Sequence, residues 1–293
     1  MVEPPAAGDP TYASQLADLS ESKPLIARAL IAGEEARLVR LNSYFSGARL
    51  KGLEQLHDYL NRAERFYAES RNLAPLSFLL ARVRADFETA IEAALTGYVA
   101  VASDAMRDVM EIEGLLLAFL TDDSLADEWL TCDSRTRRNK FAPVKIRDRL
   151  KAAGVAPYAN DAFEPVDYRA HSEALHVVPE SGSFLRRGLA PRDGLFDDIP
   201  FIEMFEHGNR IMTAIELLRV GRLFHEERES EYEPPTDRAD FDEAHERTRQ
   251  MQVIVIAFME ASGQLATQLD RAPKRSEVIQ HVADRLREHH DRG

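Results

Sequence analysis

The chain has 293 residues, of which 44% are hydrophobic and 30% are charged, a balance typical of a folded protein and not of a disordered one. Its net charge of −13 disfavours nonspecific binding to polyanions, and its longest apolar runs, Leu115–Leu120 and Val253–Met259, are far shorter than the roughly 18–20 residues of a membrane helix. A single cysteine, Cys132, excludes an internal disulfide, so we expect a cytoplasmic protein with no membrane segment.

The first residues, Met1–Pro10, have neither the basic start nor the apolar core of a signal peptide. We therefore expect residues 1–20 to form a loose tail. Over Leu25–Ser46 and Leu50–Ala68, apolar residues recur at every third or fourth position, which predicts two helices. Pro75 then suits the first turn of a further helix, because a proline there gives up no intrahelical hydrogen bond.

The segment Leu76–Leu120 contains no proline and only two glycines, Gly97 and Gly114. It predicts one long helix, or two helices with a kink near Thr96–Gly97. Apolar residues lie on most sides of this segment, whereas a surface helix carries them on one side only. We therefore expect a central, buried helix.

The next segment, Asp122–Phe141, is polar and broken, with one short helix expected around Leu125–Leu130 and with Trp129 packed there. Pro143 then starts another helix, which Gly154 ends. Further along, we expect a helix over Pro165–Val178, a loop over Ser181–Pro200, a long helix over Phe201–Glu229, a linker over Glu229–Asp237, and a helical pair over Asp237–Leu269 and Lys274–His290.

Together these segments predict an all-α fold. We expect a multi-helix bundle of about eight to ten helices over residues 21–229, with a C-terminal helical extension over residues 237–293. The best strand candidate, Met251–Ile256, lies within a continuous helical pattern. The sequence contains no Gly-rich phosphate loop and no CxxC, HExxH or GxSxG motif, so it does not predict the common nucleotide, zinc or hydrolase sites, and we expect no cofactor.

A stripe of small and polar residues runs along the second half of the apolar segment. Small residues such as Gly114 would let another helix approach closely. Arg107 and Glu111 lie one turn apart on the stripe and would point into this seam, where they can pair. The alternative is a solvent-facing pair, which contributes about 0.2–0.5 kcal/mol. The stripe consists of Ala100, Ser103, Asp104, Arg107, Glu111, Gly114 and Ala118.

The helix that Pro165 opens carries Arg169, Ser172 and His176 on one face, at spacings of three and four. Histidine can transfer a proton near neutral pH, and arginine can stabilise the charge that develops on a phosphate. A ribose 2′-hydroxyl can attack the neighbouring phosphodiester with this help and without a metal. We expect His176 to be the general acid and base and Arg169 to stabilise the phosphate. The alternative is a structural histidine.

The segment Arg169–His176 resembles the arginine, four-to-six residues, histidine signature of the HEPN superfamily (higher eukaryotes and prokaryotes nucleotide-binding). Thr96–Leu117, with Arg107 and Glu111, is similar to uncharacterised bacterial members, in which an Arg/Glu helix precedes a Ser-x-x-x-His helix. Here that second motif is Ser172 to His176, followed closely by a proline.

The resemblance covers about residues 75–180. It implies an all-α bundle that is often homodimeric, and an activity as a metal-independent ribonuclease of a bacterial stress or defence system. It also implies that Arg107 and Glu111 support the catalytic pair. The same arginine-to-histidine spacing occurs at Arg219/His225, Arg238/His245, Arg275/His281 and Arg285/His290.

Two other functions are open alternatives. The first is a noncatalytic interaction module, in which the polar pairs only tie helices together. The second is a di-iron carboxylate bundle, which needs two Glu-x-x-His pairs and glutamates on other helices. The candidate ligands are Glu54, His57, Glu173 and His176, with Glu88 or Glu92 and Glu111.

One segment is strongly basic although the chain as a whole is acidic. Between Arg135 and Lys151 lie eight basic residues, opposed only by Asp148. The ordinary interpretation is a solvated helix face and loop. The functional one is contact with an anion, and we expect RNA as the partner because its phosphates bind arginine and lysine.

Overall fold

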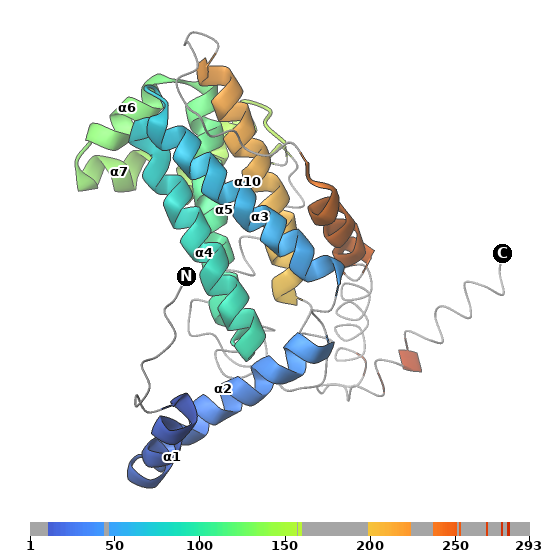
Figure 1. The fold of residues 1–293 in the computed structure, drawn as a ribbon. Coiled ribbons are helices and arrows are strands. Elements are labelled where there is room, and N and C mark those ends of the chain that lie inside the picture. The colour runs from blue at the N-terminus through green and yellow to red at the C-terminus, as the bar shows by residue number, and fades with distance from the viewer. Residues whose placement is uncertain are drawn as a thin grey trace, which may run out of the picture.

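The computed structural model describes residues 11–43, 47–156, 158–159, 199–223 and 237–250, with single positions at 252, 268, 277, 280 and 281. These residues contain no strand, so the predicted all-α fold is confirmed for them (Figure 1). None of their helices is long and apolar enough to cross a membrane. The elements are α1 (Tyr12–Ser22), α2 (Pro24–Ser43), α3 (Ala48–Glu69), the 3-10 turn η1 (Ala74–Leu76), α4 (Ser77–Thr96), α5 (Val99–Thr121), α6 (Ser124–Thr131), α7 (Ser134–Lys140), α8 (Pro143–Ala152), α10 (Ile199–Leu223) and a helical stretch over residues 239–250.

Several predicted segments lie outside these residues. They are the helix over Pro165–Val178, the loop up to residue 198, residues 224–236 of the long helix and linker, and nearly all of the C-terminal pair beyond residue 250.

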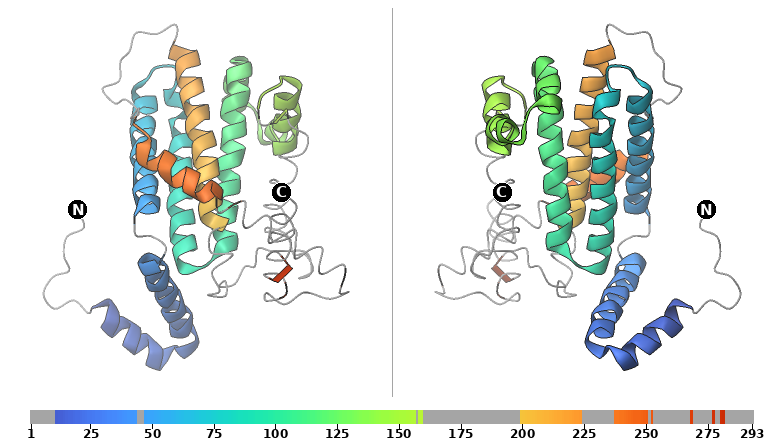
Figure 2. Two further views of the ribbon diagram at one scale, coloured as in Figure 1. Left: turned by 90° about the vertical axis from the view of Figure 1, so that its right-hand side faces the viewer. Right: turned by 90° about the vertical axis from the view of Figure 1, so that its left-hand side faces the viewer.

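Helix α5 lies at the centre of the bundle, because α4, α10 and α8 all pack against it. Its buried residues lie on most sides, from Val99 to Phe119, as its apolar pattern predicts. Figure 2 shows α3, α4 and α10 on one side of α5 and α8 on the other. The prediction of a central, buried helix is therefore confirmed.

A left-handed glycine turns the chain between α4 and α5. Gly97 has a φ of 87°, and the amide of Tyr98 donates to the carbonyl oxygen of Ala93 at 2.8 Å, as in a Schellman cap. The two helices then pack along each other, so the expected kink is instead a tight reversal. The positive φ favours glycine at this position, and the guanidinium of Arg40 lies close by, 2.9 Å from where a Cβ would stand.

Trp129 of α6 packs onto the bundle as predicted. Its ring stacks on Phe78 with centroids 5.9 Å apart and an interplanar angle of 7°, and it lies tilted against Phe119. The chain continues into α7 and α8. Pro143 lies in the first turn of α8, and Gly154 follows the helix with a φ of 71°.

Residues 239–250 pack across α3 and α10 and belong to the bundle core. Phe241 and Ala244 are buried, and the Phe241 ring lies 5.3 Å from that of Phe205. The amide of Phe241 donates to Oε1 of Gln55 at 2.8 Å. A Cβ on Gly52 would lie 2.7 Å from that of Ala244, so glycine lets this stretch approach α3. The described start of the predicted C-terminal extension therefore packs on the bundle.

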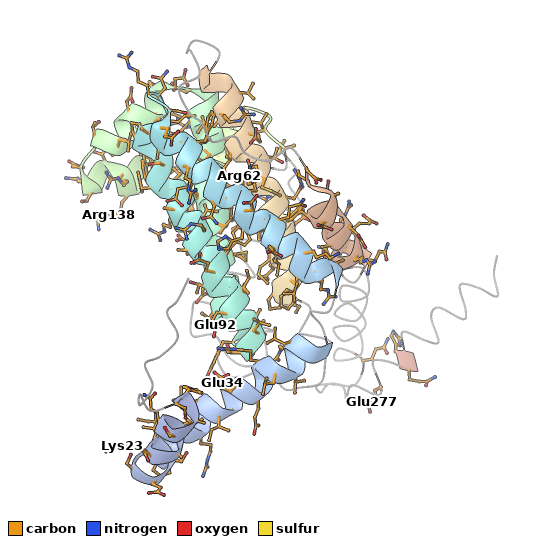
Figure 3. All side chains as sticks on the ribbon, in the orientation of Figure 1. Lys23, Glu34, Arg62, Glu92, Arg138 and Glu277 are labelled. Atoms are coloured by element: carbon orange, nitrogen blue, oxygen red, sulfur yellow. The ribbon has the colours of Figure 1, made fainter. Side chains whose placement is uncertain are left out.

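Helices α1 and α2 lie at one end of the bundle (Figures 1 and 2). The tail predicted over residues 1–20 is wrong from Tyr12 onward, because the side chain of Thr11 accepts a hydrogen bond from the amide of Ser14 and caps α1. Helix α2 reaches α4 through Arg37, which pairs with Glu34 at 3.6 Å and with Glu92. Figure 3 shows these two glutamates at the junction of the two helices.

Candidate functional site

Two of the five predicted site residues, Arg107 and Glu111, lie on α5. Arg169, Ser172 and His176 lie outside the described residues. Nε of Arg107 donates to Oε1 of Glu111 at 3.1 Å, which is the pair that their spacing predicts. The two side chains are 19% and 31% exposed, so the pair is neither sealed in the core nor fully solvated.

Arg107 and Glu111 line an open groove between α4 and α5 in which carboxyl groups gather. Burial raises the pKa of Asp86 to about 7, and the charge and hydrogen bond of Asp108 raise it as well, while Arg82 lowers it. Arg82 itself pairs with Asp108. The Asp86 carboxyl can therefore hold a proton near neutral pH. The groove is lined by Asp86, Thr89, Val101, Asp104, Ala105, Arg107, Asp108 and Glu111.

Glu111 is shifted in the same direction as Asp86. Burial raises the pKa of its carboxyl, Arg107 acts against this, and Asp108 adds to it. Carboxyl groups with raised pKa beside an arginine are typical of acid–base sites, although ion pairs that serve structure show such shifts too. Chemically, this groove can donate or accept a proton near neutral pH.

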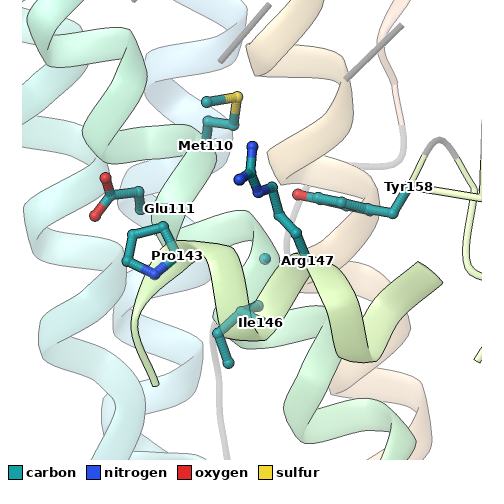
Figure 4. A pocket seen from close by; sticks show the side chains of 7 residues that line it. Met110, Glu111, Pro143, Ile146, Arg147 and Tyr158 are labelled. Carbon is teal, nitrogen blue, oxygen red and sulfur yellow. The ribbon is translucent and has the colours of Figure 1, made fainter. Parts of the chain in front are cut away.

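Gly114 lets α8 approach α5 beside the groove. A Cβ on Gly114 would lie 3.3 Å from Cγ2 of Ile146 and 3.4 Å from the hydroxyl oxygen of Tyr158. This close approach brings Arg147 of α8 into the same small pocket as Glu111. Figure 4 shows the Glu111 carboxylate and the Tyr158 hydroxyl on opposite sides of this pocket. The lining residues are Met110, Glu111, Gly114, Pro143, Ile146, Arg147 and Tyr158.

The basic stretch between Arg135 and Lys151 forms α7 and α8. Arg137 is held in place, since its guanidinium lies 5.5 Å from the Trp129 ring centroid and donates to the carbonyl oxygen of Cys132 at 3.1 Å. An open groove between the two helices gathers three cations with two neutral polar groups, a composition that suits phosphate oxygens. It is lined by Thr136, Asn139, Lys140, Lys145 and Arg149.

Comparison with family models, with curated proteins and with solved structures finds no match for this chain. The functional interpretation therefore depends on the residues of this chain alone. The two grooves along α5 and α8 are the features that bear on it.

A more deeply buried ion pair, which the sequence analysis missed, joins α5 to α10. Nε of Arg210 lies 3.0 Å from Oε2 of Glu113, and the two side chains are 9% and 2% exposed. The Arg210 guanidinium also lies 5.8 Å from the centroid of the Tyr158 ring. The sequence marks Glu113 only as an acidic residue in an apolar helix. Glu111 is marked in the same way, so the sequence does not show which of the two is deeply buried.

One competing arginine-to-histidine match, Arg238/His245, lies within the described residues and has structural partners. Nη2 of Arg238 donates to Oδ1 of Asn209 at 2.6 Å. Nε2 of His245 lies 3.1 Å from Oε2 of Glu206, and this hydrogen bond lowers the pKa of that glutamate. Both residues therefore tie residues 237–250 to α10.

In the described part of the chain, no three His, Cys, Asp or Glu side chains lie close enough together to hold a metal ion. Of the residues named for a di-iron bundle, His57 and Glu88 are in contact, with Nε2 3.0 Å from Oε1, on the surface between α3 and α4. Glu92 pairs with Arg37 and Glu111 pairs with Arg107. These glutamates thus have arginine partners of their own.

Proposed function

We propose that this chain is a HEPN-like, metal-independent endoribonuclease of a bacterial stress or defence system, which acts in the cytoplasm as a homodimer. The observation that supports the proposal most is the packing of the basic helix α8 on α5. Because Gly114 admits α8, Arg147 of this basic helix lines the same small pocket as Glu111, which belongs to the half-buried Arg107–Glu111 pair.

The expected reaction is an attack by the ribose 2′-hydroxyl on the adjacent phosphorus. The P–O5′ bond breaks, which leaves a 2′,3′-cyclic phosphate and a 5′-hydroxyl. In this proposal His176 removes the 2′-proton and returns a proton to the leaving oxygen, and Arg169 stabilises the charge on the phosphate. Ser172 lies between them on the same predicted helix face, and Arg107 with Glu111 supports them.

RNA cleavage in the presence of a chelator tests the catalytic part. Wild type is expected to cleave, and His176→Ala is expected to lose about 100-fold or more of the rate, the usual contribution of a general acid–base group. His57→Ala is the matched control, because His57 lies on the surface between α3 and α4. Equal rates for wild type and His176→Ala would remove His176 from the mechanism.

RNA binding at different salt concentrations tests the α7–α8 groove separately. Lys145→Glu and Arg149→Glu are each expected to weaken binding and to reduce the slope of log K against log[salt] by about 1, because each removes one phosphate contact. The control is Arg62→Glu on α3, an exposed arginine of the same charge. An unchanged slope for both groove variants would show that RNA does not bind there.

A second candidate is a noncatalytic interaction module. It is favoured by the Glu113–Arg210 pair, which joins α5 to α10 and has the burial expected of a structural tie. Under this alternative, neither wild type nor any variant cleaves RNA. The substitutions Arg107→Ala and Lys145→Glu then change only stability or partner binding.

A further inference from the structure

An aromatic stack lies where α6 packs against the start of α4, at the end of the bundle away from α1 (Figure 1). The rings of Phe78 and Trp129 are nearly parallel, with an interplanar angle of 7°. Phe119, which is fully buried, lies tilted against Trp129. Phe78 itself is 50% exposed. Because Trp129 lies against one face of the Phe78 ring, we infer that the exposed half is the opposite face with its rim.

The exposed half of Phe78 is not needed to hold α6 in place, because that contact uses only the covered face of the ring. An exposed aromatic face is a flat π surface. Unpaired nucleobases stack on such surfaces with little regard to their sequence, because every base has a π face of its own. The chemistry of the stack therefore suits a base.

Helix α7 joins this stack to the basic groove. The guanidinium of Arg137 lies 5.5 Å from the centroid of the Trp129 ring and donates to the carbonyl oxygens of Trp129 and Cys132, both at 3.1 Å. Lys140, which lines the α7–α8 groove, pairs with Glu128, the residue before Trp129. The stack and the groove thus meet at the corner between α6 and α7.

The charge of α7 suits the phosphates that would accompany such a base. The helix carries only cations among its charged residues, and Arg135 and Arg138 are exposed. Figure 3 shows Arg138 at the outer edge of the helix. Two carboxylates of the same corner are engaged in the fold, since Glu128 pairs with Lys140 and Asp133 caps α7. Arginine side chains beside an aromatic face are typical of sites that bind single-stranded nucleic acids.

We propose that the exposed face of Phe78 is a stacking platform for an unpaired base of an RNA strand whose phosphates bind in the α7–α8 groove. The inference rests on the RNA binding proposed above and names its substrate class as single-stranded RNA. A duplex does not fit the platform, because its bases are already covered by their stacked neighbours. The platform requires neither His176 nor a cleavage step.

Binding of a labelled 2′-O-methyl oligouridylate of about 12 nucleotides tests the platform. This strand lacks the 2′-hydroxyl that cleavage needs, so it stays intact. Phe78→Leu is expected to raise the Kd about 5- to 100-fold, because leucine keeps an apolar contact with Trp129 and removes the π face. Phe78→Tyr is expected to bind like wild type. The matched control is Tyr12→Leu on α1, an aromatic residue that is 56% exposed.

An abasic strand of the same length separates stacking from phosphate binding. It carries the same backbone charge and no bases, so wild type and Phe78→Leu are expected to bind it equally. Phe78→Leu should also leave the slope of log K against log[salt] unchanged, because stacking releases no counterions. Lys145→Glu, in contrast, is expected to reduce that slope.

The fold of each variant is checked at the site itself. Trp129 is the only tryptophan of the chain, so its emission spectrum reports on this corner. An emission maximum and circular dichroism identical to those of wild type show that Phe78→Leu acts on binding. The comparison of the oligouridylate with the abasic strand on wild type alone needs no variant.

The platform is overturned if wild type binds the oligouridylate no more tightly than the abasic strand, or if folded Phe78→Leu binds it as tightly as wild type. The second result leaves RNA binding in the groove standing, provided that Lys145→Glu still weakens it. A wild type that binds neither strand removes the groove as well. Base-dependent binding without any cleavage of unmodified RNA would keep the platform and remove the nuclease proposal.

Discussion

The two arginine–glutamate pairs of α5 are alike in geometry and differ in surroundings. Arg107 and Glu111 lie 3.1 Å apart on the same helix, beside an open groove, and are 19% and 31% exposed. Arg210 and Glu113 lie 3.0 Å apart between two helices and are 9% and 2% exposed. Because water screens the first pair more than the second, we expect the loss of one partner to cost the fold more at the second pair than at the first.

The buried pair is expected to give the largest effect. Arg210→Ala leaves Glu113 without its ion-pair partner in the core, which costs about 3–5 kcal/mol of the free energy of unfolding. Chemical denaturation measures this loss. The control is Arg247→Ala, whose side chain is 63% exposed and pairs on the surface.

A double-mutant cycle sharpens the result. Adding Glu113→Gln to Arg210→Ala is expected to restore part of the lost stability, because no charge then remains buried. Strictly additive losses would contradict an ion pair between these two side chains.

Gly114 lies next to both arginine–glutamate pairs in the sequence, since it follows Glu113 directly and comes three residues after Glu111. Gly114→Val is expected to cost about 1–3 kcal/mol, because its branched side chain would press on Ile146 and Tyr158. Gly114→Ala is the matched variant. Its gain in helix propensity of about 1 kcal/mol offsets much of the crowding. If both substitutions were neutral in thermal melts, α8 would not pack closely here.

The groove beside Arg107 is expected to make stability depend on pH. The pKa of Asp86 is about 7 in the folded chain and 3.8 without its surroundings, so folding becomes less favourable as pH rises through this window. Asp86→Asn removes the dependence. Relative to wild type, its Tm is expected to be unchanged near pH 4 and about 2–4 °C higher above pH 7, since Asp86 is only half-buried and water screens part of the penalty.

The control for this prediction is Asp58→Asn on α3, where the carboxylate is 52% exposed and pairs with Arg62. Its Tm difference from wild type should not grow between pH 4 and pH 7. If Asp86→Asn were instead less stable than wild type at pH 8, the ionised Asp86 carboxylate would stabilise the fold. That result would contradict the raised pKa of Asp86.

The outer pair is expected to give the smallest change in stability. Arg107→Ala should cost about 0.3–1 kcal/mol, because the pair is partly solvated and lies within one helix. Under the nuclease proposal, Arg107→Ala strongly reduces the rate of RNA cleavage while its Tm stays close to that of wild type. A drop in stability as large as that of Arg210→Ala would instead favour the interaction module.

Local sequence signals predicted the helices well. Pro143 and Gly154 bound α8, and the apolar pattern around α5 placed it at the centre, because proline, glycine and hydrophobic periodicity act within a few residues of the chain. The reversal at Gly97 was harder to predict. A left-handed glycine differs from a kink only through the packing of α4 on α5, which spacing does not reveal.

The candidate site was only partly predictable for a related reason. Arg107 and Glu111 pair within one helix, so their spacing predicts the contact. Glu113 pairs with Arg210, which lies 97 residues later in the chain on α10. Asp86 of α4 contacts Asp108 of α5. A single sequence carries no signal for such pairings, because any of several carboxylates on an apolar helix could face an arginine elsewhere.

The hydrogen bonds that join α3 to α10 and to Phe241 have a consequence during synthesis. The hydroxyls of Tyr59 and Tyr67 donate to carbonyl oxygens of Met212 and Ile215, and Gln55 accepts from the amide of Phe241. At about 5–20 residues per second, a ribosome needs roughly 8–30 s to deliver α10 after α3 has emerged. During that time α10 cannot cover the apolar face of α3. We therefore expect chaperones to bind a nascent chain that is stalled before α10.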